Sequence, residues 1–174
     1  MESLKGDLAR LQEKIGNYDK ENLEEMLFAV AEGIYLVTHR KLVRIYLEDL
    51  TGGALSCAYT SHPAAAVRDT PFPIVSSNAL VSTVFATQAP REVTDTARTP
   101  LPLDRELNEK ASIAATCLLP ITSQGRSIGV VCVDRETPGK VVQDTAKDLL
   151  AGFATAIADS LDQARKYHQQ ILLT

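Results

Sequence analysis

The sequence lacks the features that define several large classes of protein. No apolar run reaches the ~18 residues that a membrane-spanning helix needs, and the charged start MESLKGDLARLQEK has no signal-peptide core. The sequence has three cysteines and no CxxC pair, a pattern that indicates neither a secreted disulfide scaffold nor a zinc site. We therefore expect no metal site and a cytoplasmic location, either as a free protein or as the soluble portion of a larger, membrane-anchored signalling protein.

A strong charge of either sign is absent too. The 18 lysines and arginines and the 22 acidic residues give a net charge of −4, and the basic residues form no stripe interleaved with aromatic residues. Nucleic acid is therefore not an expected partner. A chain of 174 residues fits one domain, which would bury roughly 70% of the surface that its unfolded form exposes.

What the sequence does have is a pair of β-rich runs between Ser112 and Asp134, joined by the polar turn Ser123-Gln124-Gly125-Arg126. Gln-Gly between runs rich in branched residues predicts a hairpin. Apolar residues occupy both parities along these runs, so both faces of the hairpin must be covered. We predict an antiparallel sheet with helices on one face and other elements on the opposite face.

The remaining segments predict the order helix, sheet, insertion, sheet, helix. Amphipathic spacing predicts a first helix that ends at Gly16-Asn17 and a second helix capped by Asp19. Strands are predicted at residues 42–49 and 55–61, joined by the turn Thr51-Gly52-Gly53, and at residues 91–95. In the first strand apolar residues alternate with polar ones. We also predict a loop at residues 62–73, a short helix at 77–88 and one helical turn at 105–110.

A long helix is predicted from about Val142 almost to the C-terminus. At 1.5 Å per residue it would extend about 45 Å, which is further than a sheet of this size can cover. Its distal half is therefore expected to pack on a second copy of the chain and so to make a homodimer. The residues assigned to this dimer helix are Leu150, Phe153, Ile157, Ala164, Tyr167 and Ile171.

Two of the cysteines are predicted to face each other across the hairpin. With a two-residue turn at Gln124-Gly125, residues that face each other across the hairpin have numbers that add up to 249. Cys117 and Cys132 are such a pair. Their Cα atoms would lie about 5.5 Å apart, which permits a disulfide. In a reducing compartment we expect two buried thiols, and redox sensing is the alternative.

Several short motifs, in this order and spacing, resemble a GAF domain. They are RIYLED, REVTD, the run ending Cys117-Leu118-Leu119-Pro120-Ile121, Gly125 with Ser127-Ile128-Gly129-Val130-Val131, and Asp144 ahead of Leu149-Leu150, Phe153-Ala154 and Ile157-Ala158. The resemblance covers about Leu23 to Leu161. It divides the chain into an N-terminal helical segment (1–22), a GAF domain (23–161) and an extension of the C-terminal helix (162–174).

The resemblance implies an α+β, PAS-related fold, with an antiparallel sheet and the N- and C-terminal helices on one face. On the other face, a lid of loops and short helices would cover a small-molecule pocket. The expected function is that of a non-catalytic sensory module, which relays ligand binding through its terminal helices to a covalently linked output domain absent from this chain. A ligand-free dimerisation spacer, with the lid packed by Leu80, Val84, Phe85 and Leu101, is the alternative.

A third alternative is the free-methionine-sulfoxide reductase activity of some GAF proteins, which act through thiols at the lid. No cysteine lies between Ala58 and Thr116, so no catalytic residue is expected. For the same reason no bilin attachment is expected. The cyclic-nucleotide signature Asn-Lys-Phe-Asp-Glu is reduced here to Asn108-Glu109-Lys110. Haem would depend on His62, whose Pro-rich loop favours a solvated side chain.

The ligand itself is left open by the sequence, and the cofactor is unknown. The N-terminus of the helix near Ser77-Asn78 could meet a phosphate group through its free N–H groups. The residues expected to line the pocket lie on the lid or on one inner face of the sheet. They are Tyr59, Ser77, Val81, Val84, Phe85, Asp95, Thr116 and Leu118.

Overall fold

The structure is a computed structural model that describes residues 2–50, 53–98 and 101–173. Of the predicted turn Thr51-Gly52-Gly53, the first two residues lie outside the described residues. Within the described residues, six strands form one antiparallel sheet in the order β3-β2-β1-β6-β5-β4. The strands are β1 (Leu42–Glu48), β2 (Ala54–Thr60), β3 (Phe72–Pro73), β4 (Arg91–Val93), β5 (Ala115–Ser123) and β6 (Arg126–Arg135).

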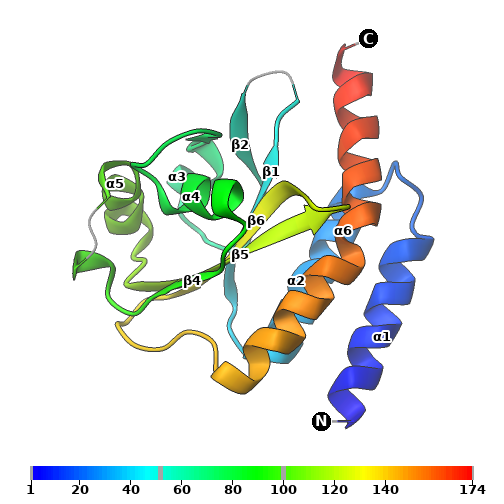
Figure 1. The fold of residues 1–174 in the computed structure, drawn as a ribbon, viewed down its shortest axis with the longest axis horizontal. Helices are drawn as coiled ribbons and strands as arrows, with labels where there is room; N and C mark the ends of the chain where they lie inside the picture. Colours follow the sequence, from blue (N-terminus) through cyan, green and yellow to red (C-terminus); the bar gives the residue numbers. More distant parts are fainter. Residues whose placement is uncertain (1, 51–52, 99–100, 174) are drawn as a thin grey trace.

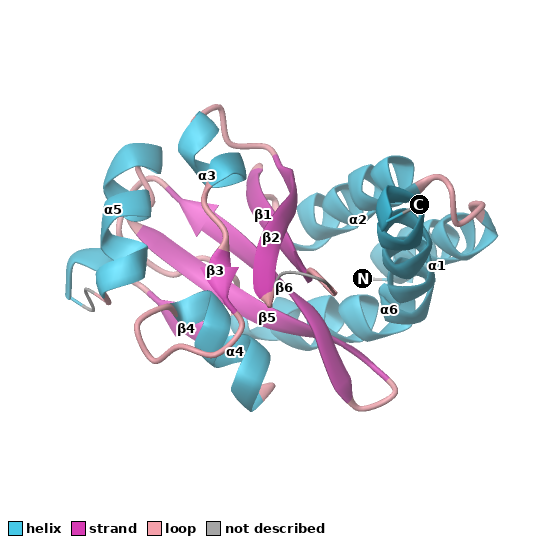
Figure 2. Ribbon diagram, turned by 90° about the horizontal axis from the view of Figure 1, so that it is seen from above, coloured by secondary structure: helices cyan, strands magenta, loops and turns pink. Residues whose placement is uncertain are grey.

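Helices cover both faces of this sheet (Figures 1 and 2). One face carries α1 (Glu2–Asn17), α2 (Leu23–Thr38) and α6 (Asp144–Leu173), which we call the helix layer. The other face carries α3 (Ala65–Asp69), α4 (Leu80–Thr87), the short 3₁₀ helix η1 (Thr96–Arg98) and α5 (Pro102–Ala111), which together form the lid. The predicted α+β architecture is therefore confirmed. No helix in the described part of the chain is long and apolar enough to cross a membrane.

The sheet separates two hydrophobic cores because successive side chains of a strand point to opposite faces. On β1, Val43, Ile45 and Leu47 belong to the core under the helix layer, whereas Tyr46 belongs to the core under the lid. The predicted alternation of this strand is confirmed, but its polar side is not wet. Arg44 and Tyr46 are 2% and 0% exposed, because the lid covers that face.

The central hairpin forms as predicted, with both faces buried. Its turn residues Gln124 and Gly125 have φ angles of 53° and 79°. Two consecutive positive φ values are those of a primed turn, whose twist matches the strands that it joins. Most side chains avoid such angles, so glycine is favoured at the second position.

The predicted pairing of Cys117 with Cys132 is wrong, because the ladder contains a bulge. Its register shifts between Ile121 and Thr122, so Cys117 pairs with Val133, and Leu118 pairs with Cys132. One extra residue on one strand reverses the faces of all later pairs. Cys117 therefore lies in the core under the helix layer, and Cys132 lies in the core under the lid.

The lid has more regular structure than the sequence indicates. Residues 62–73, predicted as a loop, contain α3 and β3, and the single helical turn predicted at 105–110 is the longer helix α5. The helix predicted at 77–88 begins only at Leu80. Hydrogen bonds tie the lid to the hairpin, because Ser127 Oγ donates to the Phe85 carbonyl (2.6 Å) and Gln88 Nε2 donates to the Gly125 carbonyl (2.9 Å).

The stripe predicted on the long helix is largely used inside this chain. Leu150, Phe153, Ile157 and Ala164 are all buried in the core under the helix layer, while Ile171 is 52% exposed. Close approach of α2 and α6 explains part of this burial. A Cβ at Gly33 of α2 would lie 2.3 Å from the Phe153 ring, so only glycine fits there without a shift.

The distal half of α6 also contacts its own chain. Arg165 Nη1 donates to the Glu48 carbonyl at the end of β1 (3.0 Å), and Tyr167 Oη donates to a Glu21 carboxylate oxygen ahead of α2 (3.2 Å). Gln169 donates to the Glu48 carbonyl and accepts from the Leu50 N–H. These contacts hold the helix end beside β1 and the α1–α2 connection. From the sequence, this half of the helix was expected to pack on a second copy of the chain.

Candidate functional site

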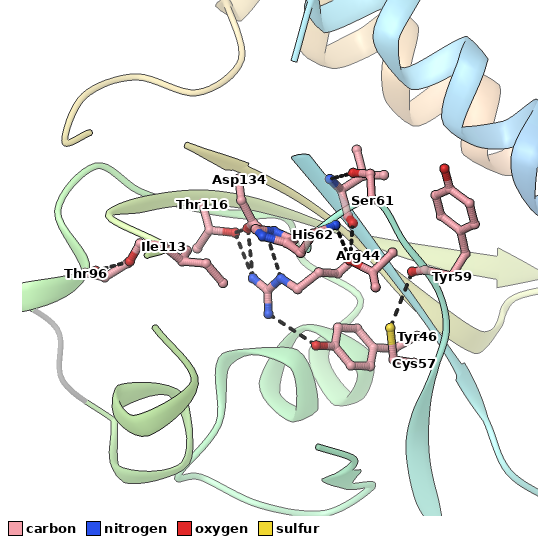
Figure 3. A network of polar contacts seen from close by, with 12 residues as sticks. Arg44, Tyr46, Cys57, Tyr59, Ser61, His62, Thr96, Ile113, Thr116 and Asp134 are labelled. Carbon is pink, nitrogen blue, oxygen red and sulfur yellow. Dashed lines mark hydrogen bonds and ion pairs between the residues drawn. The ribbon is translucent and has the colours of Figure 1, made fainter. Parts of the chain in front are cut away.

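Beneath the lid, three central strands and one loop bring five polar side chains together (Figure 3). Arg44 and Tyr46 are two residues apart on β1 and so face the same side. Thr116 on β5 and Asp134 on β6 are partners in the ladder. His62 follows the end of β2, where its N–H donates to Thr60 Oγ1 (3.1 Å). We call Arg44, Tyr46, His62, Thr116 and Asp134 the lid-side polar cluster.

Asp134 is the centre of this cluster. Arg44 binds its carboxylate with two parallel hydrogen bonds, from Nε at 2.7 Å and from Nη2 at 2.8 Å. Thr116 Oγ1 donates to one carboxylate oxygen (2.7 Å), and His62 Nε2 lies 2.7 Å from the other. Because an ionised carboxylate only accepts hydrogen bonds, Nε2 must carry the hydrogen. Both carboxylate oxygens thus have two partners each.

Arg44 is satisfied in the same way. Its Nη1 lies 3.3 Å from Tyr46 Oη, and its guanidinium carbon lies 5.8 Å from the centre of the Tyr46 ring. The Tyr46 ring in turn packs edge to face against Phe72 of β3, with ring centres 5.4 Å apart. The aromatic wall shields the ion pair from water and so strengthens it.

The cluster is charged although it is buried. Burial by itself would raise the pKa of Asp134, but the Arg44 charge and the hydrogen bonds from His62 and Arg44 lower this pKa to about 2. Burial also works against the charge of Arg44, yet Asp134 raises the Arg44 pKa well above its usual value. At neutral pH the pair is therefore ionised, and each charge has a fixed partner.

Apolar side chains pack around the polar cluster under the lid. Of the predicted pocket residues, Val81, Val84 and Leu118 are at most 1% exposed and pack in this core, Phe85 packs against it, and Thr116 belongs to the polar cluster. The other buried members of the lid core are Tyr46, Leu55, Val67, Phe72, Ala79, Leu80, Val93, Leu107, Ala111, Ile113, Val130 and Cys132.

The other three predicted residues lie elsewhere. Ser77 is exposed ahead of α4. Asp95 lines an open groove of about 680 Å³ at the outer end of the lid, together with Arg105 and Glu136. Tyr59 packs with the helix layer, and its ring meets Phe28 of α2 edge to face at 6.5 Å. The structure therefore does not bring the eight residues to one pocket.

The N-terminus of α4 is not available to an outside anion. The Leu80 N–H donates to Asp104 Oδ2 of α5 at 2.8 Å, and Asp104 is 5% exposed. Burial raises the pKa of Asp104, although the Leu80 hydrogen bond and the Arg44 charge oppose this. The sequence left a phosphate site open at this helix end, but an internal carboxylate occupies it.

The thiols are placed as packing residues. Cys117 and Cys132 are buried on opposite faces of the sheet, and Cys57 is half-buried. Burial raises the pKa of all three thiols, that of Cys117 to about 12. A thiol with a raised pKa is a poor nucleophile, because the thiolate is the reactive form. Among the described residues, no group of three or more His, Cys, Asp or Glu side chains could hold a metal ion.

Sequence reasoning missed the lid-side polar cluster. Arg44 was noted only as a polar residue of the alternating first strand. His62 was expected to be a solvated loop residue, which is wrong because it is 8% exposed and bound to Asp134. One signal was present. Asp134 ends a hairpin with two buried faces, and a lone carboxylate there needs a buried cation, which β1 offers in Arg44.

The fold and the covered lid define an α+β domain, and comparison with known proteins names the family. A family model for the GAF domain matches residues 22–161, so the chain belongs to the GAF domain family. The sequence has no significant match among curated proteins.

Three solved structures illustrate the range of proteins with this fold. The GAF domain of a phosphoenolpyruvate-protein phosphotransferase from Coxiella burnetii is 15% identical, with a TM-score of 0.77 over 95% of this chain and 96% of that one. The free methionine-R-sulfoxide reductase from Neisseria meningitidis, in complex with its substrate, is 18% identical (TM-score 0.71; 94% and 91%). A domain of a putative sensor histidine kinase from Sinorhizobium meliloti is 17% identical (TM-score 0.67; 86% and 98%).

Proposed function

We propose that this chain is a non-catalytic regulatory GAF module whose lid closes on its own side chains, and whose terminal helices join two copies and carry the signal to an output domain. The packing of the lid core is the observation that supports a module without a resident ligand. Leu80 and Val84 are at most 4% exposed in the lid core, and both Phe85 and Leu101 pack against this core. These four side chains are the ones whose packing distinguishes a spacer module from a ligand-binding one.

The polar cluster supports the same proposal. Every charged atom of the Arg44–Asp134 pair has a partner from the chain itself. A ligand that bound there would have to replace these hydrogen bonds, and an imperfect replacement would cost the full desolvation of the abandoned group. The guanidinium of Arg44 thus acts as an internal ligand for Asp134.

A second candidate function is small-molecule sensing after the lid opens, and the buried ion pair itself favours it. A buried pair is often no more stable than apolar side chains of similar volume, so its presence in a core calls for another explanation. Opening the lid would expose a carboxylate, a guanidinium and an imidazole side by side. Such a ligand would shift the lid only if it bound the open state more tightly than the closed one.

The proposal that the module is non-catalytic is supported by the thiols. The Neisseria relative of known structure is an enzyme, but here the pKa of each of the three thiols is raised by burial. Burial outweighs even the Arg44 and Arg68 charges near Cys57, so none of the three thiols has the lowered pKa that activates a cysteine. Turnover of free methionine-R-sulfoxide in the presence of dithiothreitol would contradict this part of the proposal.

Native mass spectrometry of freshly purified protein tests the dimer and the absence of a resident ligand together. We expect a dimer whose mass is that of two polypeptides alone. Retained small-molecule mass that is lost on denaturation would instead support the sensing function. The Val84→Ala variant, which removes two methyl groups from the lid core, serves as a control, because a ligand lodged elsewhere would be retained by it unchanged.

A further inference from the structure

The end of the β5–β6 hairpin contacts both covers of the sheet. Helices α4 and α6 lie on opposite faces, and the hairpin lies between them (Figures 1 and 2). At its end the turn Gln124-Gly125 joins Ser123 of β5 to Arg126 of β6. Side chains that point to different faces near this turn can therefore reach different helices.

On the lid side, two hydrogen bonds hold the hairpin end to the C-terminal end of α4. Ser127 Oγ donates to the Phe85 carbonyl at 2.6 Å, and Gln88 Nε2 donates to the Gly125 carbonyl at 2.9 Å. Gln88 follows the last residue of α4 in a left-handed conformation (φ 57°), and Phe85 packs against the lid core. Both hydrogen bonds therefore depend on the position of α4.

On the opposite side, one hydrogen bond holds the same hairpin end to the middle of α6. Ser123 Oγ donates to Asp159 Oδ1 at 2.5 Å, and Ser123 is 7% exposed. A hydroxyl that donates to a carboxylate forms one of the stronger hydrogen bonds in proteins. Ser127 pairs with Thr122 in the ladder, and Thr122 precedes Ser123, so alternation directs Ser123 and Ser127 to opposite faces.

The backbone between these contacts is a small unit of restricted conformation. Its turn residues Gln124 and Gly125 have the positive φ angles of a primed turn, which few side chains adopt. Behind the turn, the register shifts between Ile121 and Thr122, and such a bulge disrupts the ladder locally. The ladder therefore holds this end less firmly than it would in an unbroken hairpin, and the three side-chain hydrogen bonds fix its position.

We propose that the β5–β6 turn couples the position of α4 to the position of α6. In the closed lid, Ser127 and Gln88 hold the turn where Ser123 meets Asp159. Opening of the lid removes both lid-side hydrogen bonds, frees the turn and weakens its bond to α6. By linkage, movement of α6 away from the turn also loosens the lid. The inference rests on the proposed function, in which the terminal helices carry the signal, and it names the contact through which α6 responds to the lid.

A double-mutant cycle on the full chain tests this coupling. Ser127→Ala removes a lid-side hydrogen bond, and Asp159→Ala removes the helix-side one. The two residues bond to different partners on opposite faces of the sheet, and mutations without shared partners normally have additive effects. We expect the double variant to change the equilibrium constant for unfolding by less than the product of the two single effects, by a factor of at least about three. Urea unfolding at one fixed protein concentration measures this, so that dimer dissociation affects all variants alike.

Thr87→Ala combined with Asp159→Ala is the matched control. Thr87 lies at the same end of α4, but its hydroxyl donates to the Thr83 carbonyl and accepts from the Ala89 N–H. Its removal therefore changes α4 and the residues directly after it, and the two effects should be additive. Ser123→Ala with Asp159→Ala should be coupled, because these two side chains are in direct contact.

Hydrogen–deuterium exchange shows whether the effect reaches α6. In the variant that carries both Gln88→Ala and Ser127→Ala, amide hydrogens at residues 156–163 should exchange about two- to tenfold faster, as expected when one hydrogen bond is weakened. Thr87→Ala should leave them unchanged. Gln88 and Asp159 are exposed and Ser127 is half-buried, so these variants are expected to fold.

Additive effects of Ser127→Ala and Asp159→Ala, or unchanged exchange at residues 156–163, would overturn the inference. Neither measurement depends on a ligand or on the dimer interface. A ligand-free dimer in native mass spectrometry together with additive effects would therefore leave the proposed function standing without this coupling. A monomer or a retained ligand together with a coupled cycle would overturn the proposed function and leave the contact between lid and α6 in place.

Discussion

At the scale of single residues, the Arg44–Asp134 pair dominates the lid side of the molecule. Both residues are 2% exposed, and their two hydrogen bonds are 2.7 and 2.8 Å long. Removing one partner of such a pair leaves an unpaired buried charge, which is far more costly than the net contribution of the intact pair. The two positions are therefore expected to be strongly coupled.

We expect Asp134→Leu to lower the free energy of unfolding by roughly 3–5 kcal/mol, because Arg44 is left buried and unpaired. Arg44→Met combined with Asp134→Leu should cost clearly less than the single change. Urea unfolding at pH 7 measures both. Strictly additive losses would show that the pair is not coupled in the folded chain.

The same pair predicts a dependence on acid. The folded pKa of Asp134, about 2, is below its ordinary value of 3.8, so its stabilisation is present above about pH 4 and is lost as the pH falls towards 2. The loss is roughly 2 kcal/mol for this one group. The double variant, which lacks the carboxylate, serves as the reference for all other acidic groups and should show a shallower loss between pH 4 and 2.

At the scale of elements, one helix of the lid is capped by a carboxylate from another helix. No side chain of α4 caps its own N-terminus, and the Leu80 N–H is instead met by Asp104 of α5. Asp104 and Leu80 are far apart in sequence, so a local capping motif could not predict this contact. The sequence therefore predicted the helix but placed its start three residues too early, at Ser77, where cap-forming side chains are present.

Asp104→Ala should loosen α4 without affecting the helix layer. The loss of one cap costs about 1 kcal/mol, so the amide hydrogens at the start of α4 should exchange about fivefold faster. Hydrogen–deuterium exchange read by mass spectrometry measures this. Glu106→Ala is the matched control, since it removes an exposed carboxylate of the same helix, one that pairs with the Lys110 side chain. Equal effects of the two variants would count against the cap.

Register is a second property of elements that local sequence did not settle. The turn at Gln124-Gly125 was predicted, because its positive φ angles favour those residue types. The bulge near Ile128 was not, although it decides which face each later residue occupies. Gly129 follows the bulge, and a Cβ there would lie 2.2 Å from the Tyr46 carbonyl of β1, a contact that exists only in the assembled sheet.

At the scale of the whole molecule, Glu92 links the lid side to the long helix. It lies on β4, the edge strand that follows α4, and its carboxylate accepts hydrogen bonds from the Val141 and Val142 N–H groups (3.1 and 3.2 Å) just ahead of α6. Lys147 of α6 adds an ion pair at 3.1 Å. Although burial opposes it, these partners lower the pKa of Glu92. Movement of β4 would therefore reach the start of α6 directly.

Glu92→Ala should free the start of α6 while the lid core stays intact. We expect faster hydrogen exchange at residues 141–150 and a loss of roughly 1–3 kcal/mol in the free energy of unfolding, because two backbone N–H groups lose their partner. Asp144→Ala is the control, because it also removes a partner of Lys147, but one that pairs with the side chains of Lys140 and Lys147. Unchanged exchange at the start of α6 in Glu92→Ala would rule out the link.

The sequence by itself determined the central hairpin, β1, the amphipathic helices and the two-sided cover of the sheet. Each of these follows from local periodicity or from the φ preferences of a turn, so neighbours along the chain suffice. The family resemblance, carried by these same segments, was confirmed by the match over residues 22–161.

Only the tertiary structure decided the site. Whether Arg44 is wet or buried depends on the lid, which comes from a separate part of the chain, and its partner Asp134 is 90 residues away. The bulge moved Cys132 to the lid face, and close packing of α2 on α6 took in most of the stripe that the sequence assigned to a dimer. The burial of Arg44, the face that Cys132 occupies and the burial of the α6 stripe all depend on which surfaces pack together. Side-chain volume and charge determine this packing only once the helices and strands have formed.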